Sequence, residues 1–172
     1  MHTTERVSRT LRQLAFVLLF GAAMTAHGGD LNLLINGKAW HLDSQPSVTY
    51  NESNWGAGFQ YDFDATSGGW RPFVNASGFK DSNENPSYYA GGGVMYRLWE
   101  TDKLDNFAID AGGLVFLMKR EGFEDGRWFP GILPALTIGS EHLAVNVTYI
   151  PKVDPKMVPI LFFQLKVRLV GF

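Results

Sequence analysis

The sequence contains no cysteine, and this absence excludes disulfide bonds, thiolate nucleophiles and thiolate metal sites. Neither sign of charge dominates: the formal net charge is -2 at pH 7, and no basic run points to a nucleic-acid partner. Metal-ligand clusters, phosphate loops and nucleotide fingerprints are also missing, so we expect no metal and no cofactor. Beyond the N-terminal region no apolar run is long enough for a transmembrane helix, so the mature chain could cross a membrane only as a barrel.

The N-terminal region has the layout of a secretory signal peptide. Three arginines precede the apolar stretch 14–24, which is too short to cross a bilayer as a helix, and small residues follow it. We expect a signal peptide over 1–26, with cleavage between residues 23 and 28, and one domain over 27–172. A chain of 172 residues has room for at most one modest domain.

Alternation of apolar and polar residues is the main signal in the rest of the chain. In the segment 54–63, for example, Trp55, Phe59 and Phe63 share one face, opposite Gly58 and Gln60. A period of two predicts β-strands. With weaker runs included, the sequence predicts eight strands, at 31–42, 54–63, 70–80, 87–99, 106–118, 128–138, 142–151 and 159–169.

The length and polarity of these strands favour a membrane barrel. Most can cross a bilayer when tilted, which takes about 9–11 residues, and charges such as Asp110 and Arg168 fall opposite the apolar faces. The connections alternate between longer outer loops and shorter inner turns, as in outer-membrane barrels. The predicted fold is therefore all-β, an eight-stranded antiparallel up-and-down transmembrane β-barrel, with a soluble barrel as the alternative.

This topology brings three chemically capable residues to one rim. His41 lies at the outer end of the first predicted strand, and Asp81 and Ser82 lie at the outer end of the third. Since one strand lies between them, their separation along the wall is roughly 10 Å. A histidine, a carboxylate and a hydroxyl at one mouth suit acid–base and nucleophilic or orienting chemistry. Alternatively, Asp81 and Ser82 cap a turn and His41 is an ordinary surface residue.

Glycine and proline mark two further candidate features. Gly93 faces the interior near the middle of the strand 87–99, where a missing side chain leaves a void that an apolar chain could occupy. The alternative is that this glycine relieves crowding or permits coiling. Pro130 and Pro134 lie in one strand with the same parity and donate no ladder hydrogen bond. We expect a gap between strands there, which would be a lateral opening in the barrel wall for a lipid tail. The alternative is that the prolines form a simple bulge.

Five blocks of sequence, in order across most of the mature chain, resemble the PagP family, outer-membrane palmitoyltransferases that acylate lipid A. The blocks are "AWHLD" (39–43), "YNESNWGAGF" (50–59), "FKDS" (79–82), "PGILPALTIG" (130–139) and "VTYIP" (147–151). The resemblance implies transfer of an acyl chain, typically palmitate, from a phospholipid donor to a hydroxyl of lipid A. It also implies a monomer in the bacterial outer membrane and a role in resistance to antimicrobial peptides.

The resemblance also implies roles for individual residues. His41 aligns with the catalytic histidine of the family, and Asp81 and Ser82 align with its Asp-Ser pair. Gly93 falls on the glycine at the floor of the acyl-chain pocket. Pro130 and Pro134 lie in the block that resembles the lateral opening through which lipid reaches that pocket.

Two other functions compete with acyl transfer. A structural or adhesion barrel predicts an interior filled by ion pairs among Arg97, Asp110, Lys166 and Arg168, whereas an acyltransferase predicts a dry cavity above Gly93. A lipid A deacylase would show His-x-Ser on one strand, and neither His41 nor His142 is followed by that serine. Basic residues at the outer rim could face lipid A phosphates or simply be solvated; they are Lys80, Lys119, Arg120, Arg127 and Lys152.

Overall fold

The computed structural model describes residues 28–43, 50–121, 123–152 and 158–172. Most of them lie in eight strands: β1 (Gly29–His41), β2 (Ser53–Phe63), β3 (Trp70–Lys80), β4 (Pro86–Thr101), β5 (Phe107–Arg120), β6 (Trp128–Gly139), β7 (Leu143–Ile150) and β8 (Ile160–Gly171). A short 3-10 turn, η1 (Glu124–Gly126), lies between β5 and β6. The predicted strand bounds agree with these to within two residues at every end.

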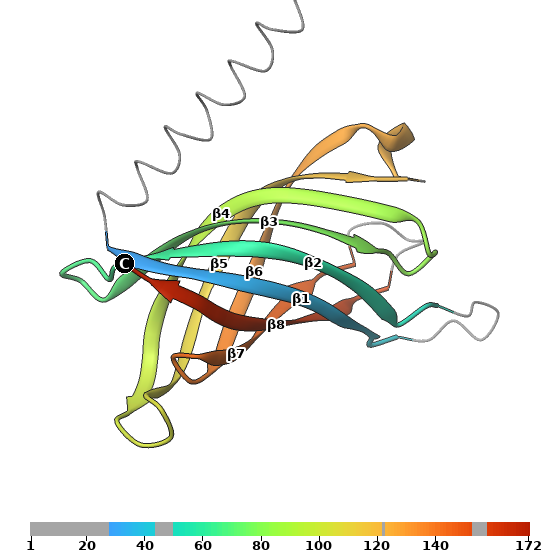
Figure 1. The fold of residues 1–172 in the computed structure, drawn as a ribbon. Helices are drawn as coiled ribbons and strands as arrows, with labels where there is room; N and C mark the ends of the chain where they lie inside the picture. The colour runs from blue at the N-terminus through green and yellow to red at the C-terminus, as the bar shows by residue number, and fades with distance from the viewer. Residues whose placement is uncertain (1–27, 44–49, 122, 153–157) are drawn as a thin grey trace, which may run out of the picture.

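The strands close into one antiparallel barrel, which confirms the predicted fold class. Each strand pairs with the next along the chain, and β8 pairs with β1 (Figure 1). Closure gives the backbone its hydrogen bonds without leaving a sheet edge, which is what a polypeptide needs inside a bilayer. The start of β1 and the C-terminus lie together (Figure 1), at what is here termed the lower end. The end where β1 finishes, at His41, is the upper end.

The barrel is apolar on its outer wall. All five tryptophans face outwards and are at least 47% exposed. Three of them lie towards the upper end (Trp40, Trp55 and Trp128) and two towards the lower end (Trp70 and Trp99). Two aromatic girdles around an apolar band are characteristic of barrels that span a membrane.

A bulge near the end of β8 determines the position of the last aromatic residue. The pairing of β8 with β1 shifts by one residue between Arg168 and Val170, so that Leu169 and Val170 both face outwards. Phe172 faces outwards as well, and its amide donates a hydrogen bond to the carbonyl of Gly29 at 2.9 Å. Uninterrupted alternation from β8 would have placed Phe172 inside the barrel.

Three of the four upper connections are longer than every lower connection, which fits the predicted asymmetry. The upper connections span 42–52, 81–85, 121–127 and 151–159, and the lower ones span 64–69, 102–106 and 140–142. Among the described residues, no helix has the length and apolar character needed to cross a membrane. The signal peptide expected over 1–26 lies outside the described residues.

Candidate active site at the upper rim

A bulge in β1 turns His41 towards the lumen. The pairing of β1 shifts at Gly37, between Asn36 and Lys38, against both β2 and β8. Below the bulge the buried side chains are even-numbered, as at Asn36, whereas above it Lys38 and Trp40 are exposed and His41 is buried. Because successive side chains alternate between faces, one additional residue reverses the faces of all that follow. Without the bulge, His41 would face lipid.

The imidazole of His41 is held between a ring and a carboxylate. Its ring stacks on that of Tyr50, with centroids 4.3 Å apart and planes inclined by 12°. Its Nδ1 lies 3.7 Å from Oε1 of Glu52 and has no hydrogen-bond partner among the described residues. The other oxygen of Glu52 accepts from Lys38 at 2.7 Å, and this hydrogen bond lowers the pKa of the Glu52 carboxyl. Glu52 therefore stays negative beside the imidazole.

The segment 50–52 connects His41 to the loop that carries Asp81 and Ser82. The Asn51 amide donates to the Ser82 carbonyl at 3.0 Å, and its side-chain nitrogen lies 3.5 Å from the Asp81 carbonyl. The carbonyl of Glu52 accepts from the amide of Ala39, in β1, at 2.9 Å. Sequence reasoning did not assign a role to 50–52, although the "YNE" of the resemblance was the signal that marked it.

Asp81 is buried and fully engaged at the top of β3. One carboxylate oxygen accepts from the amides of Asn83 and Asn85, at 2.8 and 3.0 Å, which is the turn-capping role considered as the alternative. The other accepts from Nε of Arg120 at 2.7 Å. Arg120 was expected only as a rim charge, because nothing in the sequence indicates that the top of β5 meets the top of β3.

The mutation Asp81→Asn should separate these two roles and destabilise the barrel. The amide keeps an oxygen for the loop amides but leaves the largely buried Arg120 without its anion. A hydrogen bond to a charged group contributes about 1.5–3 kcal/mol, so we expect a loss of about 2 kcal/mol in the free energy of unfolding, measured by urea titration in detergent micelles. Asp125→Asn is the control, since its ion pair with Arg127 is exposed and contributes little. Equal midpoints for both variants would contradict this account.

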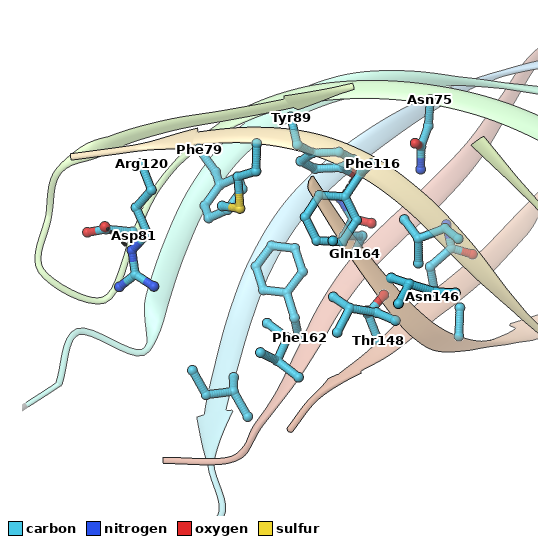
Figure 2. A pocket seen from close by; sticks show the side chains of 18 of the residues that line it. Asn75, Phe79, Asp81, Tyr89, Phe116, Arg120, Asn146, Thr148, Phe162 and Gln164 are labelled. Atoms are coloured by element: carbon cyan, nitrogen blue, oxygen red, sulfur yellow. Dashed lines mark hydrogen bonds and ion pairs between the residues drawn. The ribbon is translucent and has the colours of Figure 1, made fainter. Parts of the chain in front are cut away.

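A cavity of about 760 Å³ occupies the upper half of the lumen. Figure 2 shows Asp81 and Arg120 at its mouth, with the rings of Phe79, Phe116 and Phe162 along its length. Ser82 lines the mouth as well, whereas His41 is not among the lining residues. A space enclosed by rings and aliphatic chains, with a few polar groups, suits an apolar ligand with a polar end.

A hydrogen-bonded belt of amides and hydroxyls crosses the lumen beneath the upper part of this cavity. Gln164 donates to Asn36, and Asn36 donates to Oγ of Ser77 at 2.7 Å. Elsewhere in the belt Asn146 donates to Gln60 at 3.2 Å. Gln60 also lines a second, polar cavity of about 440 Å³ at the lower end. The belt therefore lies between an apolar upper space and a polar lower one.

Ion pairs occupy the lower half of the lumen, in a different pairing from the one considered above. Arg97 pairs with Asp110 as expected, but Lys166 pairs with Asp62 at 2.9 Å, and Arg168 pairs with Asp30 and Glu141. Either a structural barrel or an enzyme could contain such pairs. The feature that separates the two is the cavity above them, which the ion pairs do not fill.

Gly93 faces the lumen as predicted, but a neighbouring ring lies over it. Phe73 pairs directly across from Gly93, and a methyl group added at Gly93 would come within 2.8 Å of Cζ of Phe73. Gly93 is not among the lining residues of the cavity, whereas Phe73, Met95 and Leu114 line it and pack together. These three side chains form the apolar part of the cavity floor.

The barrel wall has a gap between β6 and β7. These strands pair only from Ala135 to Gly139 of β6, while β5 pairs with β6 from Trp128 onwards. Pro130 and Pro134 lie in the part of β6 that has no partner on the β7 side. Their nitrogens point to the same neighbouring strand, because donor directions alternate along an antiparallel strand, and neither can donate. The cavity reaches this gap, since both edges of it supply lining residues.

The remaining basic residues of the upper rim are exposed. Lys80, Lys119 and Lys152 lie at the surface, and Arg127 contacts only Asp125 and a backbone carbonyl of η1 among the described residues. Arg120 differs from them because Asp81 holds it at the cavity mouth. Three or more His, Asp or Glu side chains do not gather as metal ligands anywhere in the described part of the chain.

Two solved barrels resemble the chain in shape. Neisserial surface protein A has a TM-score of 0.47 and 14% identity, covering 83% of this chain and 96% of its own. Ail of Yersinia pestis has a TM-score of 0.38 and 9% identity, covering 83% of this chain and 97% of its own.

Comparison of sequences gives closer relatives. The chain is 29% identical over 131 residues to the lipid A acyltransferase PagP of Bordetella pertussis strain Tohama I, covering 72% of this chain and 68% of that protein. It is 31% identical over 119 residues to the lipid A acyltransferase PagP of Laribacter hongkongensis, covering 65% of this chain and 54% of that protein. The model of the family described as "Antimicrobial peptide resistance and lipid A acylation protein PagP" matches residues 22–166. The chain belongs to the PagP family.

Proposed function

We propose that this protein is an acyltransferase of the bacterial outer membrane that moves a palmitoyl or similar chain from a phospholipid to a hydroxyl of lipid A. The observation that carries the proposal is the apolar cavity of about 760 Å³, which opens at the rim beside Asp81 and Ser82. At about 30 Å³ for each water-sized group, a chain of sixteen carbons needs roughly 480 Å³. The cavity has room for such a tail.

The gap between β6 and β7 supports lateral access for the donor. In our proposal the tail of a phospholipid passes between Pro130–Pro134 and the upper end of β7, at membrane depth, without leaving lipid. Its ester group then stops at the mouth, near Ser82 and the segment 50–52 that holds His41. We take the enzyme to act as a monomer, because the barrel closes within a single chain.

The proposed reaction exchanges one ester for another. Nε2 of His41 takes the proton of the lipid A hydroxyl as that oxygen bonds to the ester carbonyl carbon of the donor. The bond from this carbon to the glycerol oxygen then breaks, and the glycerol oxygen receives the proton from His41. The products are acylated lipid A and a lysophospholipid. Ser82 donates a hydrogen bond to the reacting ester, and Asp81 holds the loop and Arg120 in place.

The function is tested by the lipid A of cells that lack such an activity of their own. With the wild-type protein we expect a new lipid A species, heavier by one acyl chain, and a matching rise in lysophospholipid, both detected by mass spectrometry. Cells with an empty vector are the control. The proposal is wrong if the folded barrel is present in the outer membrane and lipid A is unchanged. The additional chain should also increase survival in cationic antimicrobial peptides.

A structural or adhesion barrel is the second candidate, and the cavity argues against it. An inert barrel gains nothing from an unfilled upper lumen, because each missing side chain forfeits packing contacts. In this protein the ion pairs occupy only the lower half of the lumen and leave the upper cavity open.

A further inference from the structure

We infer that the ring of Phe73, together with Met95, sets the length of acyl chain that this protein accepts, and that Gly93 adds no depth of its own to the cavity. This inference rests on the acyltransferase function proposed above. It concerns the floor of the cavity, where an acyl tail entering from the mouth must end.

The floor is a compact apolar layer. Phe73 is 6% exposed, Met95 is 6% exposed and Leu114 is 8% exposed, and the three pack together with Phe116 and Leu133 around them. All five line the cavity. The methyl end of a tail that reached this depth would meet the Phe73 ring and the Met95 side chain.

A charged layer lies directly beneath the apolar one. Towards the lower end, Arg71 lies two residues below Phe73 in β3, and Arg97 lies two residues below Met95 in β4. The guanidinium of Arg97 pairs with Asp110. Arg71, Arg97 and Asp110 line the lower, polar cavity. An apolar tail that passed the floor would have to remove water from these charges, which is costly. The apolar layer is therefore the last place where a tail can end.

Gly93 does not provide depth of its own, because Phe73 occupies the space in front of it. A methyl group at Gly93 would lie 2.8 Å from Cζ of Phe73, but also 2.1 Å from the carbonyl oxygen of Gly113. The second contact is with the backbone of β5, which cannot rotate away. A substitution at Gly93 thus disturbs the wall, whereas a substitution at Phe73 changes only what fills the lumen.

The test uses purified protein in detergent micelles, with lipid A as the acceptor and phosphatidylcholines of defined chain length, from twelve to twenty carbons, as donors. Mass spectrometry gives the rate for each donor. Removal of a ring opens on the order of 100 Å³, and a water-sized group takes about 30 Å³, so Phe73→Ala should move the preferred donor to a chain longer by roughly two to four carbons. Phe73→Leu, which keeps apolar packing, should give a smaller shift in the same direction.

Two further variants make the result specific. Phe59→Ala removes the same ring from the lipid-facing wall of β2, where the side chain is 56% exposed, and should leave the preferred length unchanged. Met95→Ala deletes the other side chain of the floor and should also lengthen the preferred donor.

The outcomes separate this inference from the function on which it rests. If the wild type transfers no chain from any donor, the proposed function fails. If the wild type is active and Phe73→Ala and Phe73→Leu keep its preferred length, the inference is overturned. It is also overturned if both variants lose activity equally for every donor, because Phe73 would then support the wall instead of limiting the tail.

Discussion

Exchange of two neighbouring side chains, by the double mutation Trp40→His and His41→Trp, is expected to abolish acyl transfer while leaving a closed barrel in the membrane. The bulge at Gly37 places Trp40 on the lipid face and His41 on the lumen face, and the exchange leaves that bulge in place. The imidazole would then lie on the outer wall and the indole in the lumen. An outward imidazole cannot meet an ester at the cavity mouth, so the activity should fall below detection.

Gly37→Ala is a control in which both the bulge and His41 stay in place. A methyl group at Gly37 would have its nearest neighbour at 4.0 Å, and the backbone there is not left-handed, so the bulge should persist. We expect this variant to retain most of the wild-type rate. Heat-modifiable migration in gels reports closure of both barrels, and mass spectrometry of lipid A reports transfer. Activity in a closed barrel with the two side chains exchanged would show that the inward imidazole of His41 is not the catalytic base.

His41→Ala is expected to lower kcat/KM for acyl transfer by about 10²–10⁴, the usual contribution of a general base. The variant keeps the cavity, the rim loop and the gap between β6 and β7, so binding of the donor should change little. The loss should fall on kcat. The wild-type rate should also decrease as the pH falls, because only the neutral imidazole accepts a proton, and this decrease should disappear in the variant.

His142→Ala controls for loss of an imidazole as such. His142 lies in the turn between β6 and β7 at the lower end, where it contacts Asp105 at the surface. Its removal should leave the rate within the error of the assay. If a folded His41→Ala barrel acylates lipid A as fast as the wild type, the proton acceptor must be sought elsewhere on the rim.

The fold was predictable because its signals are local. Alternation in segments such as 54–63 and 106–118 fixes which side chains face lipid, and the up-and-down order of the strands fixes which ends share a rim. The gap in the wall was predictable for the same reason. Neither Pro130 nor Pro134 has a backbone N–H to donate, whatever surrounds it. Because the two residues share the same parity, both missing hydrogen bonds would have pointed to the same neighbouring strand.

The parts that could not be predicted depend on one-residue shifts or on contacts between distant strands. The residue types around Gly37 do not distinguish a bulge from a regular strand, although the orientation of His41 depends on the bulge. The pairing of Asp81 with Arg120 joins β3 to β5, and the ring of Phe73 covers a glycine of the next strand. Alternation predicts that Phe73 and Gly93 face inwards, but not that one fills the space left by the other.

The belt through Asn36, Gln164 and Asn146 has a consequence for the cell as well as for the enzyme. A bacterium depends on its outer membrane to exclude hydrophilic antibiotics and dyes, and a hollow cylinder of eight strands would be a leak if water ran through it. Here two hydrogen-bonded groups of side chains, Gln164–Asn36–Ser77 and Asn146–Gln60, stand in that route. We therefore expect cells that make this protein in quantity to keep their permeability barrier.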